Sequence, residues 1–446
     1  MDFIPNTDED KREMLEEIGV DSIAELFSDI PSEVQVQGEL IGEEGRTELE
    51  LKNEVGSLAK ENAKPGDRVN FIGAGLYDHF IPSVVSHVTG RSEFYSAYTP
   101  YQAEISQGTL TWMFEYQTAI SELTGMDIAN SSLYDGGSAA AEAVLMAQEY
   151  TGNRSVVVAN TLNPAYREVI ETYLPDPDDS VIQLPDNNGT IDTNALERTV
   201  SSNDDLAALV LQSPNYFGLI EDLRGLKEKV NDGFLIVSSN PISLGLLEPP
   251  GQFGADIVVG EGQPLGNPIS FGGPLLGLFA TRKEYLRYLP GRVSGKTTDG
   301  EGNEGFVMAL QTREQHIRRE RATSNICTNQ ALNALAATVY LSALGPAGFS
   351  RLAEINWQVS HYLARKLVEI DNVQLTWEKP FFNEFVITIG NDPERIWKSM
   401  KQEGIDLLHP KHLKHMGLDR NLMLAVTEKI RKEDMDHFAE LLEREL

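Results

Sequence analysis

The sequence predicts an α/β fold in which a mixed or parallel sheet is covered by helices on both faces, followed by a smaller α+β domain. Two observations indicate this class. From about residue 105 to residue 280, short and continuously apolar runs alternate with helical patterns, as in buried strands joined by crossover helices. Gly345-Pro346 then interrupts a long helical stretch, and the residues after it mix helices with short strands.

The chain is long enough, at 446 residues, to bury a large core and to hold more than one domain. We expect three parts. Residues 1–65 have the pattern of an N-terminal helical arm and linker, residues 66–330 that of the large α/β domain, and residues 331–446 that of a linking helix and the small C-terminal α+β domain.

The arm begins with a helix signal. Thr7 is a suitable cap for a helix whose first turn carries the acidic residues 8–10, because acids favour the positive end of the helix dipole. Apolar residues recur at helical spacing through Ile18, and a second short helix is expected over residues 21–27. Residues 38–64 are acidic and polar, which indicates a linker with a weak helix. Contacts between subunits are the plainest use of this arm.

The core elements follow from the apolar runs. Helices are expected over residues 112–123 and 139–150, on either side of a Gly-Gly-Ser turn, and over residues 328–344. The expected strands of the large sheet are 156–159, 181–184, 206–211, 234–237, 257–259 and 276–280. Those of the small domain are 373–377, 384–389 and 422–425.

Composition and charge limit the kinds of partner. The chain is 41% hydrophobic and 24% charged, as in ordinary globular proteins. Its formal charge of −31 repels nucleic acid and anionic membranes, so neither is expected as a partner, and it fits a salty cytoplasm. No uninterrupted apolar stretch reaches the roughly 18 residues of a membrane helix, and residues 1–5 carry no secretory signal pattern. A cytoplasmic protein is therefore expected.

The single cysteine, Cys327, excludes a disulfide and a multi-thiolate metal site within one chain. It precedes a helical stretch, where a small buried apolar side chain is favoured over a reactive thiol.

A polar, aromatic loop occupies residues 95–108. Tyrosines, hydroxyl residues and amides surround a proline there, a composition poorly suited to a core and well suited to a cleft or a subunit contact. The side chains that we single out in it are Tyr95, Tyr98, Thr99, Tyr101, Gln102 and Glu104.

Two glycine-containing turns lie at a helix start or a strand end, where ligands commonly bind. Gly136, Gly137 and Ser138 start a helix, where free backbone N–H groups favour phosphate. The pattern alone favours the other interpretation, a tight turn before an Ala-rich helix packed on the sheet. Further along, residues 256–264 form a strand and a polar turn, and a Gly-Gly-Pro at 272–274 leads into another strand.

These segments resemble the N-terminal half, or subunit 1, of the glycine cleavage P-protein family. The likeness also covers FIGAGLYDH at 71–79, LTGMDIAN at 123–130, QTREQHIRRE at 311–320 and ATSNICTNQAL at 322–332. It runs from the arm to past residue 345 and is less distinct in the last hundred or so residues. The resemblance implies the type I pyridoxal-phosphate-dependent transferase-like (aminotransferase-like) fold. It also implies an enzyme built from two copies each of a first and a second subunit.

The resemblance also implies which residues the cofactor chemistry needs. The second subunit of this family carries a Schiff-base lysine at a fixed interval before Gly-Gly-Pro, and counting back from Pro274 places Gln263 there. The acid that pairs with the cofactor ring normally ends the preceding strand, where this chain offers only Ser238. An amide forms no Schiff base, so this chain lacks both central cofactor residues. The turn at 136–138 is then a relic phosphate turn.

The function implied is that of a non-lysine-bearing, obligate subunit of glycine dehydrogenase (aminomethyl-transferring), inactive alone. Pyridoxal phosphate would be carried by the second subunit, with none covalently bound to this chain. The complex would decarboxylate glycine and transfer the aminomethyl group to the lipoyl group of the H-protein, and the loop at 95–108 would line or support the neighbouring site. The alternatives are a regulatory or binding pseudoenzyme on the same fold and, less favoured, a self-sufficient enzyme with another lysine.

Other candidate groups receive plainer interpretations. Lys283 is expected on a solvated surface, and Lys296 lies in a P-loop-like string that is one residue short of the spacing. His409, His412 and His415 are interrupted by lysines and favour a solvated basic face over a metal site, so no metal is expected. In the basic cluster, an interface contact is favoured over a ligand site; its members are Arg313, His316, Arg318, Arg319 and Arg321.

Overall fold

The computed structural model describes residues 5–36, 45–62, 68–322 and 324–446. The chain divides into two compact units, residues 1–64 and 65–446. Residues 38–44 and 63–64 of the expected linker, residues 1–4 and Thr323 lie outside the described residues.

The first unit is helical, as expected. Helix α1 (Asp8–Ile18) starts with a capping box in which Thr7 Oγ1 accepts from the Asp10 amide and the Asp10 carboxylate accepts from the Thr7 amide. A 3₁₀ helix, η1 (Ile23–Phe27), confirms the second short helix. Helix α2 (Glu48–Lys60) is the helix expected within the linker. None of these three helices contains a buried residue.

The second unit is built on a seven-stranded mixed sheet of order β2-β10-β9-β8-β7-β3-β4. The five strands from β9 to β4 are parallel, whereas β10 runs antiparallel to both β9 and β2. All six strands expected from apolar runs are present, so the predicted sheet is confirmed. The bounds are β2 (Ile128–Ala129), β3 (Ser155–Ala159), β4 (Val181–Leu184), β7 (Leu206–Gln212), β8 (Phe234–Ser238), β9 (Ile257–Glu261) and β10 (Gly277–Thr281).

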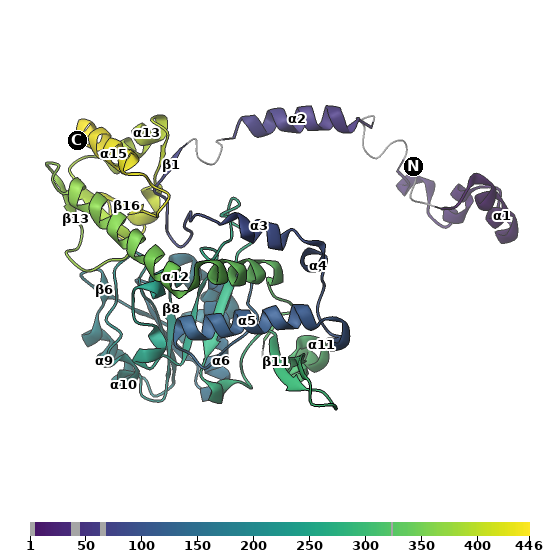
Figure 1. Cartoon of the computed structure of the whole chain (residues 1–446), viewed down its shortest axis with the longest axis horizontal. Coiled ribbons are helices and arrows are strands. Elements are labelled where there is room, and N and C mark those ends of the chain that lie inside the picture. The colour runs from purple at the N-terminus through teal and green to yellow at the C-terminus, as the bar shows by residue number, and fades with distance from the viewer. Residues whose placement is uncertain (1–4, 37–44, 63–67, 323) are drawn as a thin grey trace. The chain divides into compact units, whose positions relative to one another are not determined.

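Helices cover both faces of this sheet (Figure 1). Leu209 and Leu211 of β7 share one hydrophobic cluster with α5 (Gln107–Thr124) and α12 (Ala331–Leu367). The alternate residues Ala208 and Val210 share another cluster with α6 (Gly136–Thr151) and α7 (Pro164–Tyr173). Successive strand side chains point to opposite faces, so a continuously apolar strand needs cover on both.

Helix α12 joins the large sheet to the C-terminal elements. It is kinked at Gly345, whose φ is +62°, and Pro346 follows the kink. By length and composition it would suffice to cross a membrane, and it is the one such helix among the described residues. However, Ala334, Leu335 and Tyr340 are buried in the core beside α5. The apolar length of α12 therefore reflects its packing inside the molecule.

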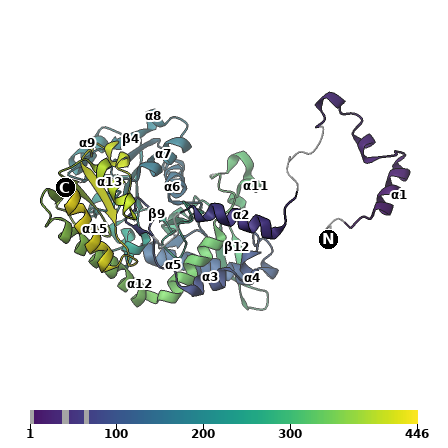
Figure 2. The same cartoon turned by 90° about the horizontal axis from the view of Figure 1, so that it is seen from above.

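The C-terminal elements form a small α+β layer with its own hydrophobic cluster. An antiparallel sheet of β13 (Val373–Leu375), β14 (Glu384–Ile389) and β16 (Asn421–Ala425) confirms the three expected strands. Helices α13 (Pro393–Gln402) and α15 (Lys432–Glu445) lie together here (Figure 2). Far from these elements in sequence, β1 (Val69–Asn70) pairs in parallel with β15 (Ile405–Asp406). The start of the second unit is thereby bonded to its C-terminal part.

Candidate functional site

The edge formed by the carboxyl ends of the parallel strands carries the residues singled out for cofactor chemistry. In an α/β sheet, ligands bind at this edge. Ser238 is the last residue of β8, and Gln263 follows β9 by two positions. Both are buried, Gln263 to 1% exposure. The structure therefore brings both positions to the sheet edge where a cofactor would bind.

The Gln263 side chain is fully engaged with the backbone of its own chain. Its Oε1 accepts from the Tyr77 amide at 3.1 Å, and its Nε2 donates to the Tyr77 carbonyl at 3.1 Å and to the Asn267 carbonyl at 2.7 Å. An amide, unlike a lysine amine, matches one donor and one acceptor of the same residue. Gln263 therefore makes a two-way contact with the segment at residues 71–79.

The glycine turn at the start of α6 already faces carboxylates. Glu261 Oε2 accepts from the Gly136 amide at 3.0 Å, and Asp135 accepts from the Ser138 amide at 2.8 Å and the Ser138 hydroxyl at 3.0 Å. These contacts occupy N–H groups that a helix start would otherwise offer to phosphate. Behind the turn, the Ala-rich part of α6 is buried against the sheet.

Glu261 is the central acidic residue of this edge. Its Oε1 also accepts from the amides of Gln263 and Leu276, each at 2.9 Å. Burial raises its pKa to about 7, although the three backbone N–H groups oppose that shift. Tyr166 of α7 packs over the same turn, since a Cβ on Gly136 would lie 2.3 Å from the Tyr166 hydroxyl. Glycine is therefore required at position 136 by close packing.

Little space remains beside Ser238 and Glu261. The cavity lined by Tyr77, Tyr166, Ser238 and Glu261, among others, has a volume of about 20 Å³. Such a space accommodates about one water molecule.

The aromatic loop forms a second, more open feature. It lies between α4 (Ser92–Tyr95) and α5, and includes the 3₁₀ turn η3 (Ala103–Ile105). Tyr98 is 90% exposed and Tyr95 is 65% exposed. Both, together with Thr99, line a cavity of about 200 Å³ that reaches the start of α12. Gln102 and Glu104 are exposed on the surface beyond it.

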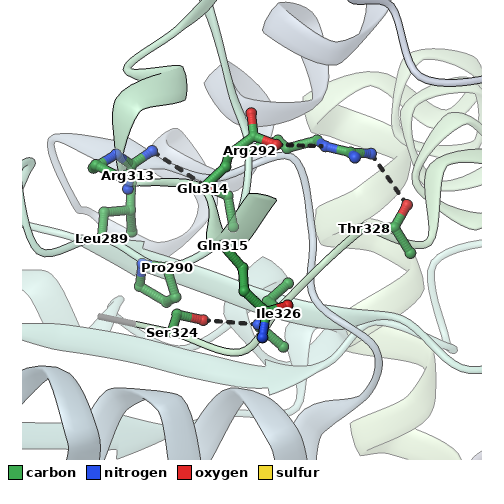
Figure 3. Close-up of a pocket in the computed structure, with 10 residues that line it drawn as sticks. Leu289, Pro290, Arg292, Arg313, Glu314, Gln315, Ser324, Ile326 and Thr328 are labelled. Atoms are coloured by element: carbon green, nitrogen blue, oxygen red, sulfur yellow. Dashed lines mark hydrogen bonds and ion pairs between the residues drawn. The ribbon is translucent and has the colours of Figure 1, made fainter. Parts of the chain in front are cut away.

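A buried arginine connects this loop to the basic cluster. Arg292, only 6% exposed, lines the 200 Å³ cavity and donates to the Tyr101 hydroxyl at 3.3 Å and the Thr328 hydroxyl at 3.1 Å. Its guanidinium also lies over the Tyr101 ring, 5.6 Å from the centroid. Glu314 lies 3.7 Å from its Nε (Figure 3). Arg292 was not singled out from the sequence, because a single arginine beside a turn matches no sequence motif for a buried or functional arginine.

One member of the basic cluster is half-buried, and the other four are exposed. Arg313 is half-buried and donates to the Gly291 carbonyl at 3.2 Å, and burial lowers its pKa. His316 packs edge-on against Tyr101, with 5.7 Å between ring centroids. The remaining members are exposed; they are Arg318, Arg319 and Arg321. Two motifs separated by about two hundred residues, the aromatic loop and the basic cluster, thus meet at Tyr101.

One expectation was wrong. Cys327 is exposed instead of buried. Cys327 is not part of a helix, because α12 begins only at Ala331. Its backbone amide donates instead to the Tyr134 hydroxyl at 3.1 Å. The apolar helical face that would have buried the thiol therefore starts after it.

The other candidates lie away from the sheet edge. Lys283 is exposed, and Lys296 lies in an exposed part of β11 (Val293–Thr298), paired with Glu304. His409 packs on Trp397, and its Nε2 lies 3.6 Å from Glu394. The pKa of His412 is lowered, mainly by burial and also by neighbouring positive charges. Over the part of the chain that the structure describes, no group of three or more His, Cys, Asp or Glu residues is arranged to hold a metal.

The sheet order and its covering helices define the type I pyridoxal-phosphate-dependent transferase fold. A sphingosine-1-phosphate lyase structure from Burkholderia pseudomallei K96243 has a similar fold, with a TM-score of 0.66 and 16% identity over 93% of each chain. The chain belongs to the glycine cleavage system P-protein family, whose model matches residues 1–442. The resemblance seen in the sequence is thus confirmed.

Individual relatives agree with this membership. A protein named probable glycine dehydrogenase (decarboxylating) subunit 1, from Geobacillus thermodenitrificans, is 49% identical over 98% of this chain and 97% of its own length. The crystal structure of a glycine decarboxylase (P-protein) of the glycine cleavage system, in inhibitor-bound form, is 38% identical with a TM-score of 0.89 and full coverage of both chains.

The residues at this sheet edge do not fit the cofactor of the fold. Position 263 has an amide whose atoms are already bonded, and the Gly136 amide at the α6 turn already donates to Glu261 and is not free for a phosphate. The cavity beside Ser238 and Glu261, of about 20 Å³, accommodates about one water molecule. No catalytic step is therefore assigned to a cofactor in this chain.

Proposed function

We propose that this chain is the non-lysine-bearing subunit of the glycine-decarboxylating P-protein of the glycine cleavage system. Together with a lysine-bearing second subunit it decarboxylates glycine and transfers the aminomethyl group to the lipoyl group of the H-protein. The observation that carries the proposal is the bonded amide of Gln263 in a chain that matches the family over residues 1–442. It supports an obligate subunit that is inactive alone.

The second subunit carries the pyridoxal phosphate in this proposal, and none is covalently bound to this chain. The two kinds of subunit form a two-plus-two heterotetramer in the cytoplasm. The subunit number in the relatives' names supports a second subunit. The relatives come from bacteria, which fits a cytoplasmic enzyme.

The aromatic loop faces the second subunit in this proposal and lines or supports its active site. Exposed tyrosines support this assignment, because Tyr98 and Tyr95 would bury large apolar rings on association. Arg292 holds the loop through the Tyr101 hydroxyl. The exposed arginines at 318, 319 and 321 form the adjoining part of the same contact and pair with acids across it.

A regulatory or binding pseudoenzyme is the alternative function on the same fold. A pseudoenzyme would also lack the Schiff-base lysine. However, the relatives are named as glycine dehydrogenase subunits, so this alternative finds no support among them.

The decisive experiment is reconstitution. The chain is titrated into the second subunit with pyridoxal phosphate and lipoylated H-protein, and carbon dioxide release from glycine is followed. We expect activity that neither chain has alone and that saturates at equal amounts of the two chains. Full activity of the second subunit alone, unchanged by this chain, would contradict the proposal.

A further inference from the structure

Residues 71–77 connect the small C-terminal layer to the edge of the large sheet. The segment follows β1, which lies beside the C-terminal elements (Figure 1). The Phe71 amide donates to the Asp406 carbonyl, and the Phe71 carbonyl accepts from the Ala425 amide, both at 2.9 Å. Six residues later, Tyr77 makes its two-way contact with Gln263. One short segment is thus bonded at one end to the small layer and at the other to the large domain.

Glu384, the first residue of β14, binds the middle of this segment. Its Oε1 accepts from the Ala74 amide at 2.7 Å, and its Oε2 accepts from the Tyr77 hydroxyl at 2.8 Å. The approach is close, because a Cβ on Gly73 would lie 2.2 Å from Glu384 Oε1. The pKa of Tyr77 is raised well above its usual value, mainly by burial and also by the nearby charge of Glu384. The hydroxyl therefore keeps its proton and acts as a hydrogen-bond donor.

The large domain holds the same segment from the opposite direction. Asn163 Nδ2 donates to the Ala74 carbonyl at 3.2 Å, and Gln263 holds both backbone groups of Tyr77. A buried backbone N–H or C=O group without a hydrogen-bond partner destabilises the folded state. Each of these bonds therefore replaces a hydrogen bond to water that the segment loses on folding. Tyr77 is therefore bonded to both domains at the position where the fold would place a ligand.

We infer that residues 71–77, Glu261, Gln263 and Glu384 form an internal latch in place of a cofactor. Glu261 supplies the hydrogen-bond acceptor at the start of α6, and Tyr77 joins Gln263 of the large domain to Glu384 of the small one. The chain holds no pyridoxal phosphate at this edge, and Gln263→Lys alone does not create a cofactor site. The latch goes beyond the proposed function, which requires only that the second subunit carry the cofactor.

The first test maps the cofactor onto residues. Wild type and Gln263→Lys, each in complex with the second subunit, are saturated with pyridoxal phosphate, reduced with borohydride and digested for peptide mapping. We expect the same cofactor content in both complexes, with the label on the second subunit and none at position 263. Labelling of position 263 above that of the exposed Lys283, which serves as the background control, would overturn the inference.

The second test uses wild-type protein, so it holds even where Gln263→Lys does not fold. Hydrogen exchange at the amides of Ala74 and Tyr77 should be slow in the full chain and unchanged by added pyridoxal phosphate. Tyr77→Phe removes the bond to Glu384 and should speed exchange at Ala74 roughly tenfold; Tyr288→Phe, outside the latch, should not. Fast exchange in wild type, or protection that depends on pyridoxal phosphate, would overturn the latch. Neither test reads decarboxylation, so failure of the proposed function would be a separate result.

Discussion

The Arg292 guanidinium donates a hydrogen bond to the Tyr101 hydroxyl across 191 positions of the chain. This bond fixes the middle of the aromatic loop to a buried charge. Arg292 also donates to the Cys327 carbonyl at 3.0 Å and to Thr328, so it connects the loop to the segment before α12. The loop that is proposed to meet the second subunit is therefore positioned from inside the molecule.

Replacing Arg292 should loosen this loop and destabilise the chain. Arg292→Gln removes a buried charge that is hydrogen-bonded to three groups and also removes its ion pair with Glu314, which should lower the free energy of unfolding by about 3 kcal/mol. Denaturant unfolding measures the change. Arg431→Gln, which removes an exposed arginine paired with the half-buried Asp434, is the control and should cost less than about 1 kcal/mol. Equal effects of the two variants would contradict the role given to Arg292.

Tyr98 should matter for association and not for folding. Its side chain is 90% exposed, so Tyr98→Ala should change the free energy of unfolding by less than about 0.5 kcal/mol. If the ring is buried against the second subunit, its loss should weaken binding by about 2 kcal/mol, roughly thirtyfold. Calorimetric titration with the second subunit measures this, and Tyr98→Phe should keep most of the affinity. An unchanged affinity of Tyr98→Ala would remove the loop from the interface.

Glu142 should make the chain less stable as pH rises. Burial raises its pKa to about 7 in the folded chain from a usual 4.5. The folded state therefore binds more protons than the unfolded state between these values, and the free energy of unfolding falls as pH rises through that window. Glu142→Gln should be more stable than wild type at pH values above about 7, by up to about 3 kcal/mol.

The matched control for Glu142 is Glu149→Gln, an exposed acid on the same helix, which should leave the pH dependence as in wild type. Thermal unfolding across the window from about pH 4.5 to 8 distinguishes the two variants. If the free energy of unfolding of wild type changed with pH just as that of Glu142→Gln does, the raised pKa of Glu142 would be contradicted.

Gly136 should tolerate no side chain while Tyr166 is present. A Cβ there would lie 2.3 Å from the Tyr166 hydroxyl and 3.0 Å from the Glu261 amide, so Gly136→Ala should cost about 2 kcal/mol. The cost should be smaller in a Tyr166→Ala background, which a double-mutant cycle measures. Gly108→Ala, in open space on α5, should be neutral or stabilising. Additive effects at 136 and 166 would show that the two residues do not meet.

Cys327 should react as an exposed thiol. In the folded chain without denaturant, a chromogenic disulfide reagent should modify one thiol per chain, because the side chain is exposed. Cys327→Ala should abolish the reaction. A thiol that reacts only after unfolding would restore the buried interpretation.

Most of the fold could be predicted because its signals are local. The buried strands from residue 156 to residue 280 are continuously apolar, and burial on both faces requires that pattern. The helix at Thr7 was likewise predictable, since its capping box spans four consecutive residues. The exposure of Cys327 was not predictable, because it depends on where α12 starts to pack.

The candidate site was predictable only in part. A count along the chain from Pro274 was enough to find an amide at position 263, where the resemblance places a lysine. Glu261 carried a weak signal, as the one charge that ends an apolar strand, although its three N–H partners come from separate segments. Arg292 and Tyr166 gave no signal.

The sequence by itself determined where the strands of the large sheet from residue 156 to residue 280 lie, that an amide stands at position 263, and which family the chain resembles. Only the tertiary structure decided what stands at the cofactor edge. Gln263 meets Tyr77 across 186 positions, and Tyr77 meets Glu384 across 307. Hydrogen bonds between such distant residues form only after the sheet and the small layer have packed, so no local pattern encodes them.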